Sequence, residues 1–549
     1  MVRKRALFLG RREAFALLFL GACQGGFVDA IQPPLQAGDS PDDVIVLPDG
    51  GTAVVPKPPT AGDKSVCAPR VESRLALLSD LQQLTALRAM LGEDALTGDD
   101  LPQAQLKPFM QKGTVVNTSL VHTRNEWARM ASEGKPPQHG CSDAGCAEKF
   151  LRTFTARAFR RPVDDEEIKD LMEVYTLAAQ VSPAHGVQRA VEAVLAAPSF
   201  AFRREIGSSK DGVRALDAYE LASVLSFAVS DGPPDDELWA AAADGSLLDP
   251  AERKQQVTRL LAQESVRETV TGTLLAAWGL GNLFGAAKDP TLFPSFTPQL
   301  MASMYHETEM MVSDVLWTRG APVSELLSTN RSFVDAPLAA LYGLPAPKAA
   351  FSPVELPATQ RSGLLTQASV LAMLSRSDTT SVVARGLFVR GLLCMAKTPS
   401  PPESLTDAIS DLLKQDLSER ERAAVRAQNP TCGGCHAGID PYGLLLESYD
   451  PLGRYRTSKD DEPIEVKGAF AGTYEGATDF IAQVAEADDF GHCVATRVLS
   501  YALQDDALAP KDCQVKEALD GADPTALEMD DLMQRMLSSP SIAYRKEAP

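Results

Sequence analysis

The sequence predicts a mainly α-helical protein, with several small helical domains in series and little β structure. Apolar residues recur at helical spacing in most segments, as the six leucines between Leu75 and Leu87 illustrate. At 549 residues, the chain is long enough for about three or four domains. Capping boxes, in which a capping side chain precedes a glutamate by three positions, mark three helix starts: Asp164 to Glu167, Asp217 to Glu220 and Ser418 to Glu421.

The N-terminus has the layout of a signal peptide over residues 1–22. Basic residues from Lys4 to Arg12 precede an apolar run, Ala14–Ala22, that is too short to persist as a membrane-spanning helix. The run ends in Leu20-Gly21-Ala22-Cys23, which resembles a bacterial lipobox, so we expect cleavage before Cys23 and lipid on its thiol. The alternative is a soluble secreted protein that is cleaved nearby. We therefore expect a bacterial protein exported to the periplasm, outer membrane or cell surface.

The rest of the chain divides by composition and helical pattern. Residues 23–66 are expected to form the lipidated cysteine and a disordered tether, because Pro, Gly and Asp are frequent there. Five helical domains follow, of which the second contains the motif Arg157-Ala158-Phe159-Arg160-Arg161-Pro162 and the fourth a paired-cysteine motif. A small hairpin is predicted at 463–473. The predicted domain bounds are 67–135, 140–207, 213–345, 355–460 and 475–549.

The paired-cysteine motif is Cys432-Gly433-Gly434-Cys435-His436, a C-x-x-C-H run. This spacing is the attachment signature of c-type haem. Two thiols two residues apart can bond to the two vinyl groups of one porphyrin, and the histidine that follows then becomes the proximal iron ligand. The motif therefore predicts one covalent haem c, bound by Cys432, Cys435 and His436, in a cytochrome c-like domain near the C-terminus.

Three other interpretations of the motif stay open. A structural zinc site needs four ligands, and the sequence holds no second C-x-x-C and no H-x-x-x-H. A thioredoxin-type redox pair would follow a strand, whereas residues 418–428 have a helical pattern. The third alternative is a plain disulfide or two free thiols, with His436 incidental.

Further residues are candidates for the haem environment. Arg454 and Arg456 are expected either to face the haem propionates, since guanidinium groups match carboxylates, or to form surface ion pairs. The sixth iron position decides between electron transfer and binding of a small ligand. His492 is one candidate for the distal ligand, and several methionines are others: Met373, Met395, Met529, Met533 and Met536.

The nine cysteines fit an exported protein. If Cys23 carries lipid and Cys432 and Cys435 carry haem, six thiols remain. An even number in an oxidising compartment indicates up to three disulfides. We expect two local pairs, Cys141 with Cys146 and Cys493 with Cys513.

The formal net charge of −20 argues against nucleic acid as a partner, because phosphate binding relies on clusters of Lys and Arg. The sequence specifies neither a redox partner nor a substrate. Membrane contact is expected through the lipid anchor alone.

Several motifs, taken in order, resemble the planctomycete- and myxobacteria-type multi-domain cytochrome-like proteins, which are strings of domains of unknown function. The resemblance covers about residues 67–545 and implies a mostly helical, exported, haem c-like protein without an established reaction. The chain departs from the pattern at Leu444–Glu447, where an aromatic residue is common, and at Tyr449, where Phe is frequent. The matching motifs are Leu87–Gly92, Arg157–Pro162, Pro198–Arg203, Leu221–Phe227, Arg361–Leu365, Arg385-Gly386, Cys432–His436, Asp440–Gly443, Glu447 and Asp450–Arg454.

Three functions compete at this stage. The first is an exported, lipid-anchored c-type haem protein that transfers electrons in the cell envelope. The second is a haem-dependent oxidase or peroxidase that acts on an unknown substrate, and the third is a non-catalytic envelope binding protein with structural cysteines. A single C-x-x-C-H counts against a di-haem peroxidase, while the more than four hundred residues before it favour recognition of a partner or substrate.

Overall fold

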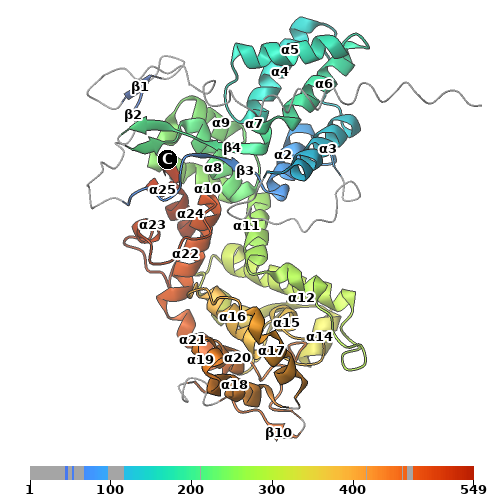
Figure 1. Cartoon of the computed structure of the whole chain (residues 1–549), viewed down its shortest axis with the longest axis vertical. Coiled ribbons are helices and arrows are strands. Elements are labelled where there is room, and N and C mark those ends of the chain that lie inside the picture. Colours follow the sequence, from blue (N-terminus) through green and yellow to red (C-terminus); the bar gives the residue numbers. More distant parts are fainter. Residues whose placement is uncertain are drawn as a thin grey trace, which may run out of the picture. The chain divides into compact units, whose positions relative to one another are not determined.

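The computed structural model describes residues 44–46, 52–54, 67–96, 116–210, 212–415, 417–459, 461–466 and 474–548 (Figure 1). It confirms the prediction of a mainly helical chain with small sheets. The predicted signal peptide, Cys23 and most of the predicted tether lie outside the described residues. No helix among the described residues is long and apolar enough to cross a membrane.

The chain divides into two compact units, residues 1–55 and 56–549. In the first, strands β1 (Val44–Val46) and β2 (Thr52–Val54) form an antiparallel pair. Both strands fall within residues 23–66, the segment for which a disordered tether is expected. The sequence reason is that β-branched residues stand on each side of Pro48-Asp49-Gly50: all three in Val44–Val46, and Thr52 and Val54 in Thr52–Val54.

The N-terminal helices of the second unit share one hydrophobic core, which includes Leu87, Trp127, Leu151 and Val191. Helix α4 ends where Arg160 adopts a left-handed backbone conformation (φ 58°), just before a proline. The elements are β3 (Arg74–Leu77), α2 (Asp80–Leu91), α3 (Thr118–Gly134), α4 (Ala144–Phe159), α5 (Asp165–Ala178), α6 (Pro183–Ala196) and α7 (Pro198–Ala201).

Several elements make up the central part of the chain, and among them α8 is buried along nearly its whole length. They are β4 (Phe202–Glu205), β5 (Ser208–Lys210), β6 (Val213–Ala215), α8 (Ala218–Ser230), α9 (Asp236–Ala243), η1 (Ser246–Leu248), α10 (Pro250–Leu261), α11 (Glu264–Ala277), η2 (Leu280–Gly285), α12 (Pro298–Ser313), η3 (Asp314–Thr318), α13 (Glu325–Ser328), β7 (Arg331–Val334), α14 (Ala336–Tyr342) and β8 (Ser352–Glu355).

The paired-cysteine motif lies among short helices. These are η4 (Leu364–Thr366), α15 (Ala368–Met373), α16 (Val382–Leu392), η5 (Glu403–Leu405), α17 (Thr406–Lys414), α18 (Glu419–Gln428), α19 (Pro430–His436) and α20 (Asp440–Leu444). A hairpin of β9 (Ser458–Lys459) and β10 (Glu462–Pro463) follows, earlier than the predicted 463–473, of which residues 467–473 are not described. The last elements are α21 (Ala477–Ala485), α22 (Asp488–Leu503), α23 (Cys513–Ala518), α24 (Met529–Ser538), α25 (Pro540–Ala543) and β12 (Tyr544–Lys546).

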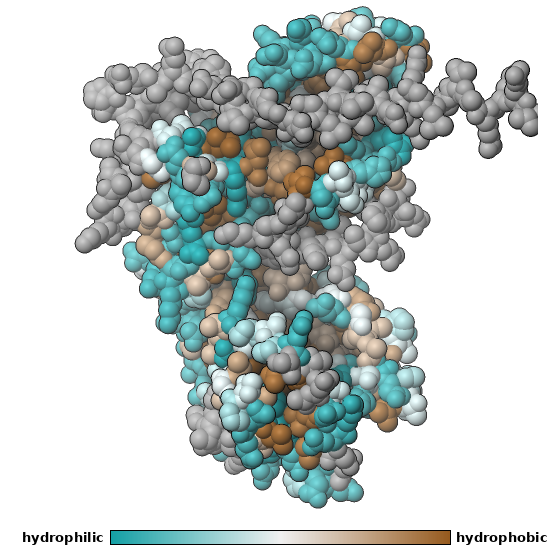
Figure 2. All heavy atoms as spheres, in the orientation of Figure 1, coloured by the Kyte–Doolittle hydropathy of each residue, from teal (hydrophilic) through white to brown (hydrophobic). Residues whose placement is uncertain are grey.

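The C-terminal segment returns to the beginning of the unit. Helix α24 packs on α10 and α22 (Figure 1). Strand β12 pairs with β6 in a three-stranded sheet. Strand β3 pairs separately with β4. The visible face in Figure 2 mixes many hydrophilic residues with scattered apolar ones, in keeping with the high net charge.

A buried ion cluster joins these strands. Glu205 on β4 is fully buried and accepts hydrogen bonds from Arg203 (2.6 and 2.8 Å) and from Arg545 on β12 (2.8 Å), both of which are also buried. Arg74 on β3 lies 3.5 Å from the same carboxylate. Burial alone would raise the pKa of Glu205, but the charges of the three arginines outweigh it and lower this pKa to about 2.

We predict that Glu205→Gln destabilises the protein by about 3–5 kcal/mol, because it leaves buried guanidinium groups without their anion. The midpoint of urea unfolding measures this. The control is Glu72→Gln, which removes a half-exposed carboxylate paired with Lys546 at the same sheet and should cost at most about 1 kcal/mol. Folding lowers the pKa of the Glu205 carboxyl. The stability that this carboxylate contributes is therefore fully present above its unfolded-state pKa, and it is lost as the pH falls toward about 2. Equal losses for the two variants would contradict this role.

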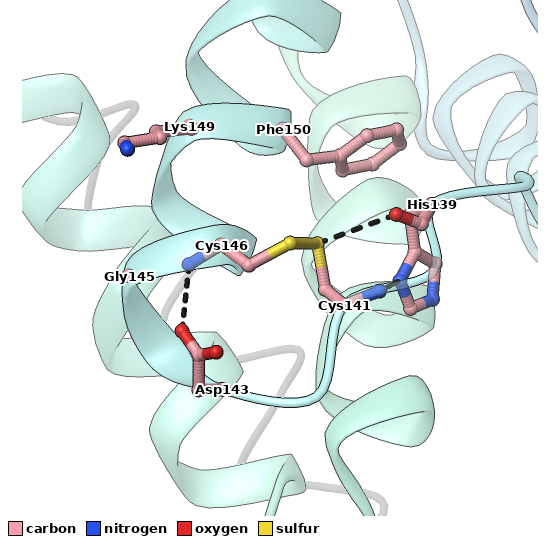
Figure 3. A pocket seen from close by; sticks show the side chains of 7 residues that line it. All are labelled: His139, Cys141, Asp143, Gly145, Cys146, Lys149 and Phe150. Carbon is pink, nitrogen blue, oxygen red and sulfur yellow. Dashed lines mark hydrogen bonds between the residues drawn. A yellow bond between two sulfur atoms is a disulfide. The ribbon is translucent and has the colours of Figure 1, made fainter.

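The described residues form three disulfides: Cys67–Cys513, Cys141–Cys146 and Cys394–Cys493. The expected pair of Cys141 with Cys146 is confirmed. The expected pair of Cys493 with Cys513 is wrong, because each of these cysteines bonds to a residue far away in the sequence. The Cys141–Cys146 bridge closes a short loop at the start of α4, beside an open cavity of about 600 Å³ that His139, Lys149 and Phe150 also line (Figure 3).

Loop length separates the expected effects of the disulfides on stability. In the chain-entropy model, a bridge between residues 446 apart stabilises by about 6 kcal/mol, and a bridge between residues 5 apart by about 2 kcal/mol. We therefore predict that Cys67→Ser/Cys513→Ser lowers the thermal unfolding midpoint much more than Cys141→Ser/Cys146→Ser does. The reverse order in calorimetry would mean that the short bridge has a role that loop closure does not describe.

Candidate functional site

The C-x-x-C-H motif forms the short helix α19, which contains no buried residue. Asn429 caps this helix, because its side chain accepts from the backbone N–H groups of Thr431 (2.9 Å) and Cys432 (3.3 Å). A Cβ on Gly433 would lie 2.8 Å from the carbonyl oxygen of Ala427 at the end of α18, so the close approach of the two helices requires glycine there.

The two thiols of the motif differ from the other cysteines of the described chain. Cys432 and Cys435 are free, whereas the other six described cysteines are in disulfides. Cys432 is partly buried and Cys435 is exposed. Residues three and four apart share one face of a helix, so α19 presents both thiols and His436 on the same side.

The imidazole of His436 is fixed by a buried carboxylate. Its Nδ1 lies 2.9 Å from Oδ1 of Asp440, the first residue of α20. Since a carboxylate only accepts, Nδ1 is the donor, and in the neutral imidazole Nε2 therefore keeps its lone pair for a metal. Asp440 in turn accepts from Nε of Arg426 on α18 at 2.8 Å, and both of these residues are buried.

The helices around Arg426, Asp440 and His436 are packed closely. A Cβ on Gly386 of α16 would lie 2.2 Å from the Ile439 carbonyl oxygen, and one on Gly443 of α20 would lie 1.9 Å from the Val382 carbonyl oxygen. Glycine at both positions allows α16 and α20 to approach backbone to backbone. Arg390 of α16 also donates to the carbonyl of Gly438, two residues after His436, at 2.8 Å.

Arg454 and Arg456, the predicted propionate partners, both pair with carboxylates of their own domain. Nε of Arg454 donates to Asp450 at 2.6 Å, and Nη2 of Arg456 lies 3.6 Å from Glu447. The predicted alternative of ion pairs is therefore what the side chains form. The role of Arg454 and Arg456 at propionates stays a prediction. The guanidinium group that lies beside the His436–Asp440 pair is that of Arg426.

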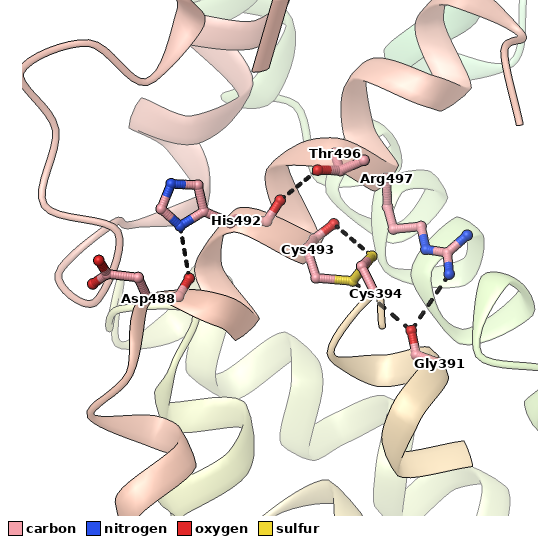
Figure 4. Close-up of a disulfide and its surroundings, with 7 residues drawn as sticks. All are labelled: Gly391, Cys394, Asp488, His492, Cys493, Thr496 and Arg497. Atoms are coloured by element: carbon pink, nitrogen blue, oxygen red, sulfur yellow. Dashed lines mark hydrogen bonds between the residues drawn. A yellow bond between two sulfur atoms is a disulfide. The ribbon is translucent and has the colours of Figure 1, made fainter. Parts of the chain in front are cut away.

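The candidate distal ligands have different surroundings. His492 donates from Nδ1 to the carbonyl of Asp488 (2.9 Å), and Figure 4 shows its ring pointing away from the Cys394–Cys493 disulfide. Met529, Met533 and Met536 are buried in the packing of α24, whereas Met395 is 38% exposed. None of these contacts tests an iron ligand, so the distal position stays a prediction.

Sequence reasoning missed Asp440 and Arg426. Asp440 follows His436 by four residues, a spacing that brings side chains together in helical segments, and this is the signal that could have found it. Arg426 gave no comparable signal, because it reaches Asp440 only through the packing of α18 against α20.

The residues at α19 fit a covalently attached haem. Two free thiols and an imidazole with an available Nε2 are the donor set that this group needs. In addition, Nη2 of Arg426 is buried without a hydrogen-bond partner among the described residues, so an acceptor such as a propionate could use it. Two free thiols, the third alternative, are what the structure shows, so it does not separate that alternative from a haem site. The zinc site and the thioredoxin-type pair fit less well. The described residues form no group of three or more metal-ligating side chains, and α19 follows a helix instead of a strand.

Three segments of the chain match family models. Residues 146–205 match PSD5, a protein of unknown function (DUF1595); residues 216–344 match PSD4 (DUF1592); and residues 361–459 match PSCyt3 (DUF1588). The chain therefore carries a series of domains of unknown function. Each match falls within one of the predicted domains 140–207, 213–345 and 355–460. No curated protein and no solved structure matched the chain.

Proposed function

We propose that the protein is an exported, lipid-anchored c-type haem protein that transfers electrons in the cell envelope. The observation that carries this proposal is the constellation on α19: two free thiols and an imidazole with an available Nε2, all on one face of one helix. The name of the family that matches residues 361–459, PSCyt3, is in keeping with a cytochrome-like domain.

The proposed attachment chemistry is balanced without an oxidant. The S–H groups of Cys432 and Cys435 would each add across one vinyl double bond, so that a C–S bond would form and the hydrogen would go to the neighbouring carbon. His436 would hold the iron through Nε2, while its Nδ1–H would stay hydrogen-bonded to Asp440. Haem c supplies a one-electron Fe(III)/Fe(II) couple when bound.

The exposure of α19 favours electron transfer over chemistry in a closed pocket. Cys435 is exposed and the helix has no buried residue, so a group bonded to these thiols would have an edge near solvent. A redox partner could approach such an edge without a conformational change. A haem-dependent oxidase or peroxidase is the alternative, and it requires an open sixth iron position.

We predict that the protein, produced where c-type haem is attached to proteins, carries one covalent haem. Cys432→Ser/Cys435→Ser should abolish it, because both thioether bonds are lost. Haem staining of a denaturing gel and the pyridine haemochrome spectrum measure this. The matched control is Cys141→Ser/Cys146→Ser, which removes two cysteines from a disulfide and should retain haem.

A colourless wild-type protein would refute the haem proposal and leave the envelope binding function. Carbon monoxide separates the two haem functions, because it binds reduced iron readily only where the sixth position is open or weakly held. Little binding to the reduced protein supports electron transfer, and ready binding supports the oxidase or peroxidase.

For the anchor, we predict that Cys23→Ala releases the protein from the membrane fraction, because the lipid would be attached to that thiol. Fractionation of cells and incorporation of labelled fatty acid test this. Cys141→Ser/Cys146→Ser, which affects a disulfide instead, should leave the protein in the membrane fraction. Release of neither variant, with no lipid incorporated, would contradict a lipid anchor.

A further inference from the structure

We propose that Asp440, held by Arg426, is a positioning residue that orients His436 and strengthens its Nε2 as an iron donor, and so holds the Fe(III)/Fe(II) midpoint potential low. This inference rests on the proposed haem function and adds how the protein regulates that site. It concerns a triad, Arg426–Asp440–His436, that comes from the three consecutive helices α18, α19 and α20.

The geometry forms an unbroken chain of charge-assisted hydrogen bonds. Arg426 Nε donates to Oδ2 of Asp440 at 2.8 Å, and Oδ1 of the same carboxylate accepts from His436 Nδ1 at 2.9 Å. The exposed fractions of the side chains are 8% for Arg426, 6% for Asp440 and 21% for His436. The carboxylate is therefore shielded from water, while the imidazole that it holds still reaches the surface.

The two carboxylate oxygens of Asp440 have different hydrogen-bond partners. One is occupied by Arg426, which fixes the carboxylate, and the other is left for the imidazole. A histidine that donates its second nitrogen to a carboxylate is fixed in tautomer and ring orientation, and its metal-binding nitrogen becomes more basic. A more basic donor favours the higher positive charge of Fe(III), which lowers the midpoint potential.

A purely structural interpretation is a buried ion pair that ties α18 to α20. In that case, loss of either partner would loosen the helices in the same way, since breaking a buried pair leaves an uncompensated charge. The electrostatic interpretation makes a different prediction. Removing the negative charge of Asp440 should raise the potential, whereas removing the positive charge of Arg426 should lower it, because the carboxylate beside His436 is then less neutralised.

The experiment is spectroelectrochemical titration of the haem-loaded full-length protein. For Asp440→Asn, we expect at least a tenfold increase in the ratio of Fe(II) to Fe(III) at fixed potential, which is a shift of 59 mV for a one-electron couple. Arg426→Gln should shift the potential in the opposite direction, and Asp440→Glu, which keeps the charge, should stay near the wild-type value. In Asp440→Asn, the iron–histidine stretching frequency of the reduced protein should fall, because the donor is weaker.

The control is Asp314→Asn, which alters a buried carboxylate paired with Arg319 and Arg331 but not with a histidine. It should leave the midpoint potential unchanged. If Asp440→Asn fails to fold, the opposite shift in Arg426→Gln carries the test, and an unchanged or raised potential in that variant would overturn the inference.

Failure of the two proposals can be distinguished. Wild-type protein without covalent haem refutes the haem function itself. Wild-type protein with haem, combined with unchanged potentials and stretching frequencies in Asp440→Asn and Arg426→Gln, refutes only the role of the triad.

Discussion

Glu205 and the arginines around it connect parts of the second unit that are far apart in sequence. This carboxylate on β4 accepts from Arg203 beside it and from Arg545 on β12, while Arg74 approaches from β3. Because the side chains of Glu205, Arg203 and Arg545 are almost fully shielded from water, none of these charges is stable there without the others. The helices between residues 80 and 540 must therefore fold so that both ends of the unit reach one buried cluster.

Buried guanidinium groups recur elsewhere, and they mostly capture backbone carbonyls at the ends of short elements. Arg160 donates to the carbonyl groups of Ser199, Phe200 and Phe202, and Arg385 donates to those of Leu446, Tyr449 and Asp450. Burial lowers the pKa of Arg160 to about 9, because water no longer solvates the cation. Irregular segments leave many carbonyls without backbone partners. A guanidinium group carries five N–H donors in a rigid fork, so it can bind several such carbonyls at once.

Local features of the sequence predicted much of the fold and part of the site. The capping boxes at Asp164, Asp217 and Ser418 are present, because such a box needs only residues three positions apart. The bridge between Cys141 and Cys146 is local in the same sense. By contrast, Cys493 bonds to Cys394 because α22 crosses the end of α16, and Cys513 bonds to Cys67 because the C-terminal segment returns. Only tertiary packing decides such partners.

The same distinction applies within the site and explains what the surrounding domain contributes. The two thiols and His436 are specified by spacing along α19, which a short peptide could also provide. The fixed tautomer of His436 depends on Asp440, whose second oxygen is held by Arg426 across the contact between α18 and α20. That contact is held in turn by α16, through the backbone approach at Gly443 and the bond from Arg390 to Gly438. Arg385 then ties α16 to residues 446–450, and the Cys394–Cys493 bridge ties its end to α22 (Figure 4). Each of these contacts restricts the movement of the group that lies closer to His436. The packing of the domain therefore holds the imidazole and its carboxylate in place before any ligand is bound.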